Sequence, residues 1–246
     1  MNRNELADHI FDTYVSLRYG MAVIGAALPL LVYAVGAVHG VELQGSMSAY
    51  YWAPDGVSAP SRNWFVGCLF ALAACLYLYK GFTIRENVAL NLAAVFGVGV
   101  AVFPTEWKCE VDCGRFSAHG SSAVLMFVCL VYVVWFRARD TLSLLPEASA
   151  ARYRQIYRGI GLVMLVSPLT AFVVNSFIGQ GKAYVFFIEA AGIWSFAAYW
   201  VIKSSEFKKT NATRRALRGE VEISPHGTAT AAPPDSPSAP DTSTSR

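Results

Sequence analysis

Charged residues are scarce in this chain: Asp, Glu, Lys and Arg make up only 15% of its 246 residues, against roughly 25% in an average soluble domain. Hydrophobic residues make up 54%, and the apolar runs follow one another so closely that no soluble domain fits between them. The net charge of +3 is too small to indicate a nucleic-acid partner. The composition therefore predicts an integral membrane protein built as one helical bundle.

Several functional classes lack their signatures. Of the four histidines, only His39 and His119 share the outer side of the topology derived below, too few for a three-histidine zinc hydrolase of the multi-span ceramidase type. The Gly-x-Ser-x-Gly element of many serine hydrolases is missing. Transport has little support, because no inverted repeat is obvious and mid-membrane charges are missing. We therefore expect no metal ion and no cofactor.

Six apolar runs are long enough to cross a bilayer. A helix needs roughly 17 to 25 residues to cross a hydrocarbon core of about 30 Å, and the polar side chains collect where the runs end, as a lipid solvent requires. The predicted fold is an all-α bundle of six transmembrane helices occupying residues 20–202. The spans are expected at about 20–39, 63–80, 87–103, 116–136, 159–178 and 184–202.

The two ends of the chain differ from this core. Residues 1–19 have the apolar spacing of an amphipathic interfacial helix, and they are not a secretory signal because three acids precede the first apolar run. Residues 203–246 are first basic and then rich in Ser, Thr, Pro and Ala, which predicts a disordered tail. The basic part, residues 203–218, is expected to face anionic lipid, either as an ordinary stop-transfer flank or as a lipid switch.

The placement of the basic residues predicts the orientation. Six spans put both termini on one side, with sixteen of the twenty lysines and arginines. The opposite loops hold only Arg62, Lys108, Arg115 and Lys182. By the positive-inside rule both termini are cytoplasmic, in a multi-pass protein of the cell membrane, or of the bacterial inner membrane if the source is prokaryotic.

Polar and aromatic residues near the outer ends of the spans predict an outward-facing polar pocket under the long loop of residues 40–62. Aromatic side chains in this loop are expected at the headgroup level, and Arg62 is a candidate ligand for a headgroup phosphate. The candidate binding residues are Ser46, Tyr50, Tyr51, Arg62, Asn63, Glu106 and Asn175.

Cys109 and Cys113 flank a short acidic loop in the sequence CEVDC. Two states stay open for them: a disulfide, which requires an oxidising compartment outside the cytoplasm, or two free thiols. The remaining cysteines lie inside apolar runs, where thiols behave as small hydrophobes.

Glu189 is a carboxylate inside an apolar run, which makes it a functional-site hypothesis; the structural alternative is a partner for Arg62 or a hydrogen bond within the bundle. His119 suits a base, a ligand or a hydrogen-bonding link. With Ser48 they supply a nucleophile, a base and a carboxylate. Ser48, His119 and Glu189 therefore define an enzymatic alternative, a lipid hydrolase or acyl-remodelling enzyme.

Residues 46–136 carry the motifs SMSAYY, WFVGCLFALAACLYLYKG, NLAAVFGVGVAVFPTEW and HGSSAVLMFVCLVYVVWF. In these motifs the chain resembles the six-span DRAM, Sfk and FGF-receptor-activating-protein group, and it is similar to uncharacterised bacterial six-span proteins. The resemblance implies a lipid-linked role such as lipid remodelling, lipid organisation or a membrane stress response. The residues that carry it are Ser46, Ser48, Gly67, Asn91, His119 and Gly120.

The leading prediction is a non-enzymatic membrane protein that binds or organises lipid in the outer leaflet. Tyr50, Tyr51, Trp52 and Trp107 are expected to contact the interface. Membrane lipids are the expected partners, a second copy of the chain or another membrane protein stays open as a further partner, and nucleic acid is not expected.

Overall fold

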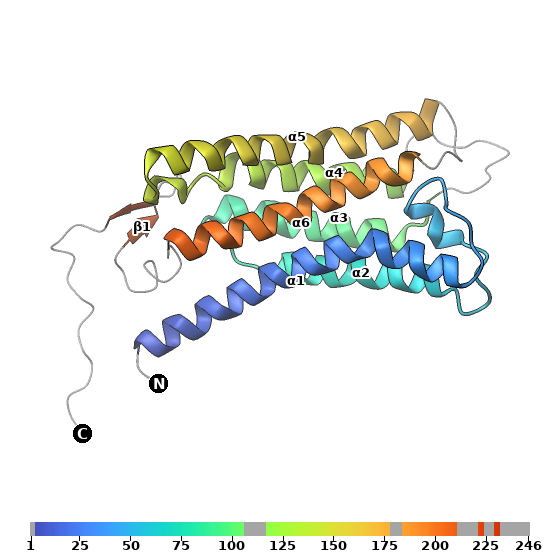
Figure 1. Ribbon diagram of the computed structural model, residues 1–246, viewed down its shortest axis with the longest axis horizontal. Coiled ribbons are helices and arrows are strands. Elements are labelled where there is room, and N and C mark those ends of the chain that lie inside the picture. Colours follow the sequence, from blue (N-terminus) through green and yellow to red (C-terminus); the bar gives the residue numbers. More distant parts are fainter. Residues whose placement is uncertain (1–2, 106–116, 178–183, 211–220, 224–228, 232–246) are drawn as a thin grey trace, which may run out of the picture.

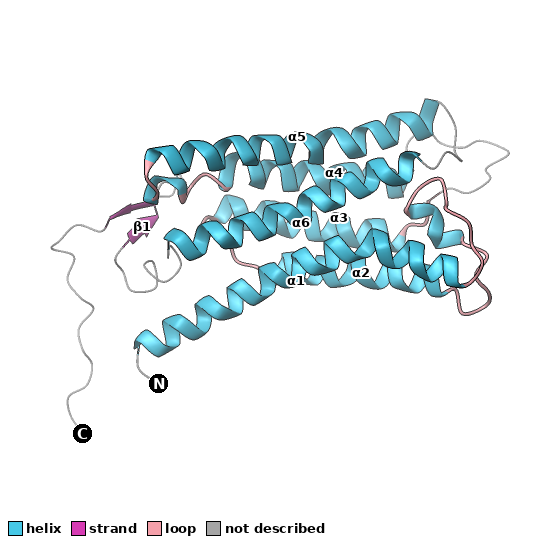
Figure 2. Ribbon diagram, in the orientation of Figure 1, coloured by secondary structure: helices cyan, strands magenta, loops and turns pink. Residues whose placement is uncertain are grey.

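The computed structural model describes residues 3–105, 117–177, 184–210, 221–223 and 229–231. Six long helices lie side by side (Figures 1 and 2). They are α1 (Arg3–Val38), α2 (Pro60–Leu78), α3 (Ile84–Val102), α4 (Ala118–Tyr132), α5 (Glu147–Phe177) and α6 (Tyr184–Thr210). The shorter elements are the 3₁₀ helices η1 (Ser48–Trp52) and η3 (Leu142–Leu144), the π-helix η2 (Val133–Arg137), and the antiparallel strands β1 (Val221–Ile223) and β2 (Ala229–Ala231).

All six long helices contain a segment long and apolar enough to cross a membrane. The predicted all-α architecture with six spans is therefore confirmed, and the protein is a multi-pass membrane protein. A helix of 19 residues, such as α2 or α3, is about 28 Å long, which matches a hydrocarbon core of about 30 Å.

Three helices are longer than the sequence predicts. α1 begins at Arg3 and continues without a break to Val38, so residues 3–19 extend the first span and do not form a separate interfacial helix. α5 begins at Glu147, which makes most of the predicted 137–158 connection helical. α6 continues to Thr210, and Lys203, Glu206 and Phe207 of its added turns are buried in the bundle.

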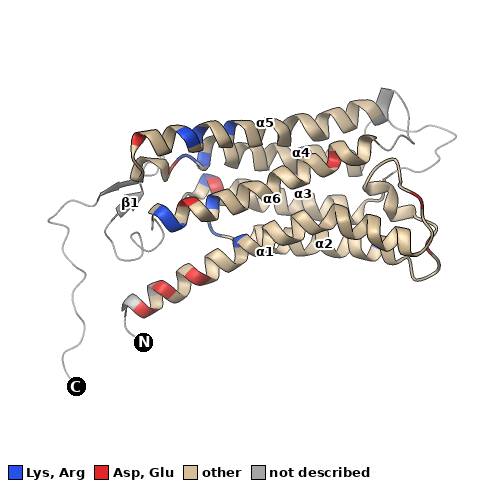
Figure 3. Ribbon diagram, viewed as in Figure 1, with Lys and Arg blue, Asp and Glu red and all other residues tan. Residues whose placement is uncertain are grey.

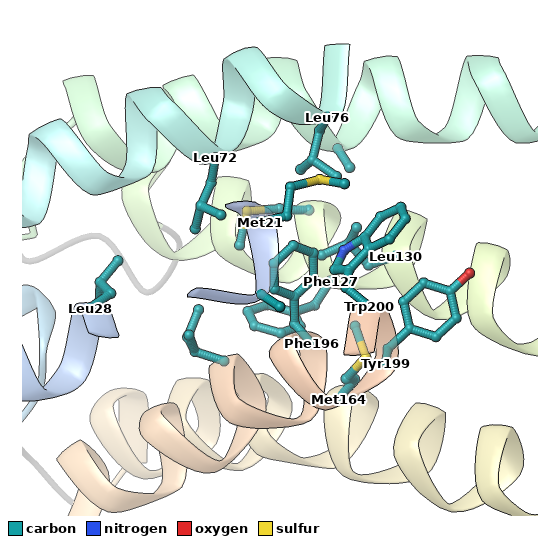
Figure 4. Packing of buried hydrophobic residues seen from close by; sticks show 14 of the residues in the cluster. Met21, Leu28, Leu72, Leu76, Phe127, Leu130, Met164, Phe196, Tyr199 and Trp200 are labelled. Atoms are coloured by element: carbon teal, nitrogen blue, oxygen red, sulfur yellow. The ribbon is translucent and has the colours of Figure 1, made fainter. Parts of the chain in front are cut away.

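The helices form a closed ring. Each packs against its neighbours in sequence, and α6 packs against α1. Large side chains from α1, α2, α4, α5 and α6 meet in the middle of the ring, where Figure 4 shows Met21, Leu76, Phe127, Met164 and Trp200 among the residues in contact. This packed interior holds the six helices in place, and it thereby positions the residues at both ends of the bundle.

The two ends of the bundle differ in charge. The terminal end holds the start of α1, the turn at 79–83, the connection at 138–146 and the end of α6; the loop end holds residues 39–59, 103–105 and 117. Lysines, arginines and acids gather toward the terminal end, whereas the helices are nearly free of them toward the loop end (Figure 3). The two ends therefore differ in chemical character.

Candidate functional site

The loop that precedes α2 folds around η1 at the loop end. The hydroxyl of Ser46 accepts a hydrogen bond from the Ala49 N–H at 3.1 Å, and the hydroxyl oxygens of Ser46 and Ser48 are 3.1 Å apart. Both serines are buried. Their hydroxyls therefore stabilise the start of η1.

Glu189 joins this loop to α6. Its Oε2 accepts a hydrogen bond from the Met47 N–H at 2.6 Å, and the Ser48 N–H also donates to its carboxylate. The Phe186 N–H donates to the Gly45 carbonyl at 3.0 Å. A carboxylate at the start of a helix satisfies otherwise unpaired N–H groups and complements the helix dipole. Glu189 thus caps η1 from the neighbouring helix.

His119, the second residue of α4, caps the end of α3. Its Nδ1 donates to the Phe103 carbonyl at 2.8 Å, and the Val100 carbonyl is a second backbone partner of the ring. These carbonyls belong to the last turn of α3, which has no intrahelical donors for them. His119 is buried, so the imidazole replaces water in satisfying them.

The side chains of Ser48, His119 and Glu189 therefore do not form a catalytic chain. Across the described part of the chain, no hydrogen bond joins any two of these three side chains, and no ion pair joins Glu189 to Arg62. A catalytic base must lie within hydrogen-bond reach of the group that it deprotonates. The geometry of the described residues gives the enzymatic alternative no support.

The aromatic residues of η1 lie in different environments. Tyr50 is completely buried against Gly36, which differs from its predicted place in an accessible binding site. This burial raises the pKa of its phenol, and the Gln44 N–H that donates to the hydroxyl opposes the effect. Trp52 donates from Nε1 to the Thr105 carbonyl at 2.7 Å. These two side chains hold the loop against α1 and the end of α3.

Arg62 and Asn63 lie at the start of α2, and Tyr51 of η1 lies beside Arg62. The guanidinium carbon of Arg62 is 5.4 Å from the centroid of the Tyr51 ring, within cation–π distance. Asn63 is exposed and donates from Nδ2 to the Ser58 carbonyl at 2.7 Å. The structure thus brings these three predicted binding residues to one edge of the loop end.

A groove of about 390 Å³ runs between α1 and α2 next to this edge. We call it the α1–α2 groove, and its lining residues are Ile24, Asn63, Trp64, Gly67, Cys68 and Ala71. Asn63 lies at its loop-end mouth, and the remaining lining is apolar or nearly so. At Gly67 no atom lies within 4 Å of the position that a Cβ would take, so the missing side chain keeps the groove open.

Some predicted site residues lie outside the described residues. Glu106, Cys109, Cys113 and Trp107 fall in the segment 106–116, and the side chain of Asn175 also lies outside the description. Among the described cysteines, Cys68, Cys75 and Cys129 are free thiols. Within the described ranges, no group of three or more His, Cys, Asp or Glu residues has the arrangement of a metal site.

The terminal end contains a buried polar site that the sequence analysis did not predict. Lys203 donates from Nζ to the Ala138 carbonyl at 2.5 Å, to Thr141 Oγ1 at 2.9 Å and to Glu206 Oε2 at 2.8 Å. Glu206 also accepts hydrogen bonds from the hydroxyls of Thr141 and Tyr157, both at 2.5 Å. Lys203 was predicted to lie in a basic flank on the lipid surface, but it is only 3% exposed. The i, i+3 spacing of Lys203 and Glu206 is the one signal in the sequence for this pairing.

Arg18 is a second cation that the sequence analysis placed wrongly. It was assigned to an interfacial helix, whereas it is 1% exposed. Nε and Nη2 donate to the Tyr79 hydroxyl at 3.1 and 2.8 Å, and the guanidinium carbon is 3.8 Å from the centroid of the Phe207 ring. Arg18 therefore links α1 to α6 and to the turn before α3.

The comparisons with known proteins add no family. No family model, curated protein or solved structure matches this chain.

Proposed function

We propose that this protein binds or organises lipid in the outer leaflet, with the α1–α2 groove as the site that receives an acyl chain. The observation that carries this proposal is the groove itself, which has a largely apolar lining and lies on two membrane-spanning helices. From Asn63 to Ala71 it follows about 12 Å of α2, close to the depth of one leaflet of a bilayer core of about 30 Å.

The residues at the mouth of the groove suit a lipid headgroup. Arg62 carries a permanent positive charge and lies beside Tyr51, and guanidinium groups favour phosphate oxygens. Asn63 lines the mouth itself, and the half-exposed indole of Trp64 extends to the same level, where tryptophan is enriched in membrane proteins. A phospholipid would thus place its phosphate near Arg62 and one chain along Gly67 and Ala71.

The orientation belongs to the same proposal. The gathering of charge at the terminal end (Figure 3) and the excess of lysine and arginine in the loops on that side favour a cytoplasmic terminal end, in a cell membrane or bacterial inner membrane. The loop end and the mouth of the groove then meet the outer leaflet.

Substitution of Gly67 by leucine tests the proposal. The new side chain would fill the groove, and we expect the affinity for 1-palmitoyl-2-oleoyl-phosphatidylglycerol, measured by native mass spectrometry of the delipidated protein, to fall at least about tenfold, or 1.4 kcal/mol. Gly159→Leu is the matched control, because Gly159 is also an exposed helix glycine with open space at its Cβ position. It should bind the lipid like the natural chain.

Two outcomes would contradict the proposal. Equal affinity of Gly67→Leu and the natural chain would show that the groove does not receive the lipid, and equal losses in Gly67→Leu and Gly159→Leu would point to a general effect of added bulk. Arg62→Gln separates the headgroup from the chain, since it should weaken phosphatidylglycerol binding but leave binding of an uncharged diacylglycerol unchanged.

A further inference from the structure

Six ionisable side chains, three basic and three acidic, are buried or nearly buried at the terminal end. We call them the terminal charge cluster, and they are Arg18, Glu86, Arg137, Asp140, Lys203 and Glu206. They come from α1, α3, η2, the connection after η2, and α6. With three cations and three carboxylates the cluster is neutral when all six are charged. Buried charges in a membrane bundle are costly and usually have a function.

The carboxylates of this cluster differ in the number of hydrogen bonds that they accept. Glu206 receives hydrogen bonds from Thr141, Tyr157 and Lys203, so its charge is fully compensated. Glu86 is different. Its Oε2 accepts one hydrogen bond, from the Phe82 N–H at 2.9 Å, and within the described residues no cation lies in ion-pair contact with it.

Glu86 nevertheless lies at the electrostatic centre of the cluster. It interacts at longer range with three cations on three other elements, namely Arg18, Arg137 and Lys203. The other titratable groups in range of it are Tyr79, Asp140 and Tyr199. Burial favours the neutral carboxyl, whereas the three cations favour the carboxylate. Glu86 thus lacks the direct donors that Glu206 receives from Lys203, Thr141 and Tyr157.

Several buried polar atoms at the terminal end lack a hydrogen-bond partner. Arg18 Nη1, Trp200 Nε1 and Arg137 Nε are buried and have no hydrogen-bond partner, and Asp140 Oδ2 has only the ion pair of 3.4 Å with Arg137 Nη1. The Tyr79 hydroxyl accepts two hydrogen bonds from Arg18, so its own hydrogen remains available for another acceptor. Buried polar groups in this state are normally satisfied by internal water.

We propose that Glu86 is a proton-binding site of the membrane domain, and that it exchanges its proton with the terminal side through water held by Arg18, Arg137 and Asp140. Arg137 and Asp140 are the least buried of the charged groups next to Glu86, which places the entry of this path between η2 and the start of α3. When Glu86 binds a proton, three cations face only two carboxylates. Their repulsion opposes the packing of α1 and α6 at this end, so proton binding is coupled to helix packing.

Infrared difference spectroscopy of the full chain in lipid nanodiscs tests this site. On acidification we expect the C=O band of a protonated buried carboxyl to appear, and to shift at once when H₂O is exchanged for D₂O. Asp140 and Glu189 are also buried or partly buried carboxyls that contribute to this band, so Glu86→Gln should remove only the Glu86 component, because the amide keeps an oxygen for the Phe82 N–H but cannot titrate. Glu189→Gln, which changes the partly buried carboxylate of the loop end, should retain the Glu86 component.

A second variant keeps the test decisive if Glu86→Gln does not fold. Arg18→Gln removes one of the three cations, so the midpoint of the band should move to higher pH by about one unit or more. A difference band identical in Glu86→Gln and the natural chain, a midpoint of the Glu86 component unmoved in Arg18→Gln, or a Glu86 component that does not respond to D₂O would each overturn the proposal. Lipid binding at the α1–α2 groove is measured separately and depends on neither variant.

Discussion

Lys203 and Glu206 lie three residues apart on α6, and their side chains form an ion pair of 2.8 Å inside the bundle. Thr141 and Tyr157 donate to the same carboxylate, so the pair attaches α6 to α5 and to the connection after η2. A pair this deeply buried is sensitive to the loss of one partner, because the remaining charge is left without compensation.

Removal of one charge from this pair should destabilise the protein strongly. We expect Glu206→Gln and Lys203→Met each to lower the free energy of unfolding by about 3 kcal/mol or more, measured by denaturant titration in detergent. The double variant should lose less than the sum of the single losses. Arg154→Met is the control, since Arg154 pairs with Glu147 at the surface, where such pairs contribute about 1 kcal/mol or less. Equal losses at both pairs would contradict this account.

Loss of the Glu189 carboxylate should release the loop around η1. Glu189→Ala removes the acceptor for the Met47 N–H, and a buried N–H without an acceptor costs about 1 to 3 kcal/mol. Hydrogen exchange in residues 41–52 should therefore become faster, while exchange at the terminal end should not change. Glu42→Ala is the matched control, because Glu42 is an exposed acid of the same loop. Unchanged protection of residues 41–52 in Glu189→Ala would show that the cap is dispensable.

Two glycines of α1 should respond in opposite directions to alanine. At Gly36 a Cβ would lie 2.7 Å from Cε1 of the buried Tyr50, so Gly36→Ala should destabilise the protein by about 1 to 3 kcal/mol. At Gly20 no atom lies within 4 Å, so Gly20→Ala should be neutral or stabilise by up to about 1 kcal/mol. Thermal unfolding of the two variants measures both effects, and a stabilised Gly36→Ala would show that Tyr50 moves without cost.

Because His119 caps a helix, its replacement should lower the stability of the protein and leave lipid binding unchanged. His119→Ala leaves the Phe103 carbonyl without its donor, and we expect a loss of about 1 to 3 kcal/mol in unfolding free energy with unchanged affinity for phosphatidylglycerol. His39→Ala is the control, because His39 is exposed in the turn after α1 and its ring bonds to the Val35 carbonyl at the end of that helix. A lipid-cleaving activity that disappears in His119→Ala would instead favour the enzymatic alternative of Ser48, His119 and Glu189.

The spans were predictable because a bilayer imposes a simple rule on composition. Apolar runs of the right length, with polar residues at their ends, correctly identified all six helices. The helix ends were not predictable by the same rule. Lys203 and Arg18 looked like flanking charges, since hydropathy does not distinguish a cation in contact with lipid headgroups from one paired inside the bundle.

A candidate site could be predicted from the sequence only where a single unusual residue marked it. Glu189 was recognised as a carboxylate in an apolar run, and its bond to the Met47 N–H matches the structural alternative of a hydrogen bond within the bundle. The α1–α2 groove depends on the missing side chain of Gly67 and on Ile24 of another helix. Pairing between distant segments of this kind leaves no local pattern in the sequence.

The bond between Met47 and Glu189 also affects biosynthesis. The two residues are 142 positions apart, so the anchor of the first long loop is synthesised only with the last span. A nascent chain that has inserted five helices still lacks the carboxylate that secures η1, together with the α1–α6 contact that closes the ring. We therefore expect intermediates truncated before α6 to be sensitive to proteases added on the loop side, and full-length chains to be resistant there.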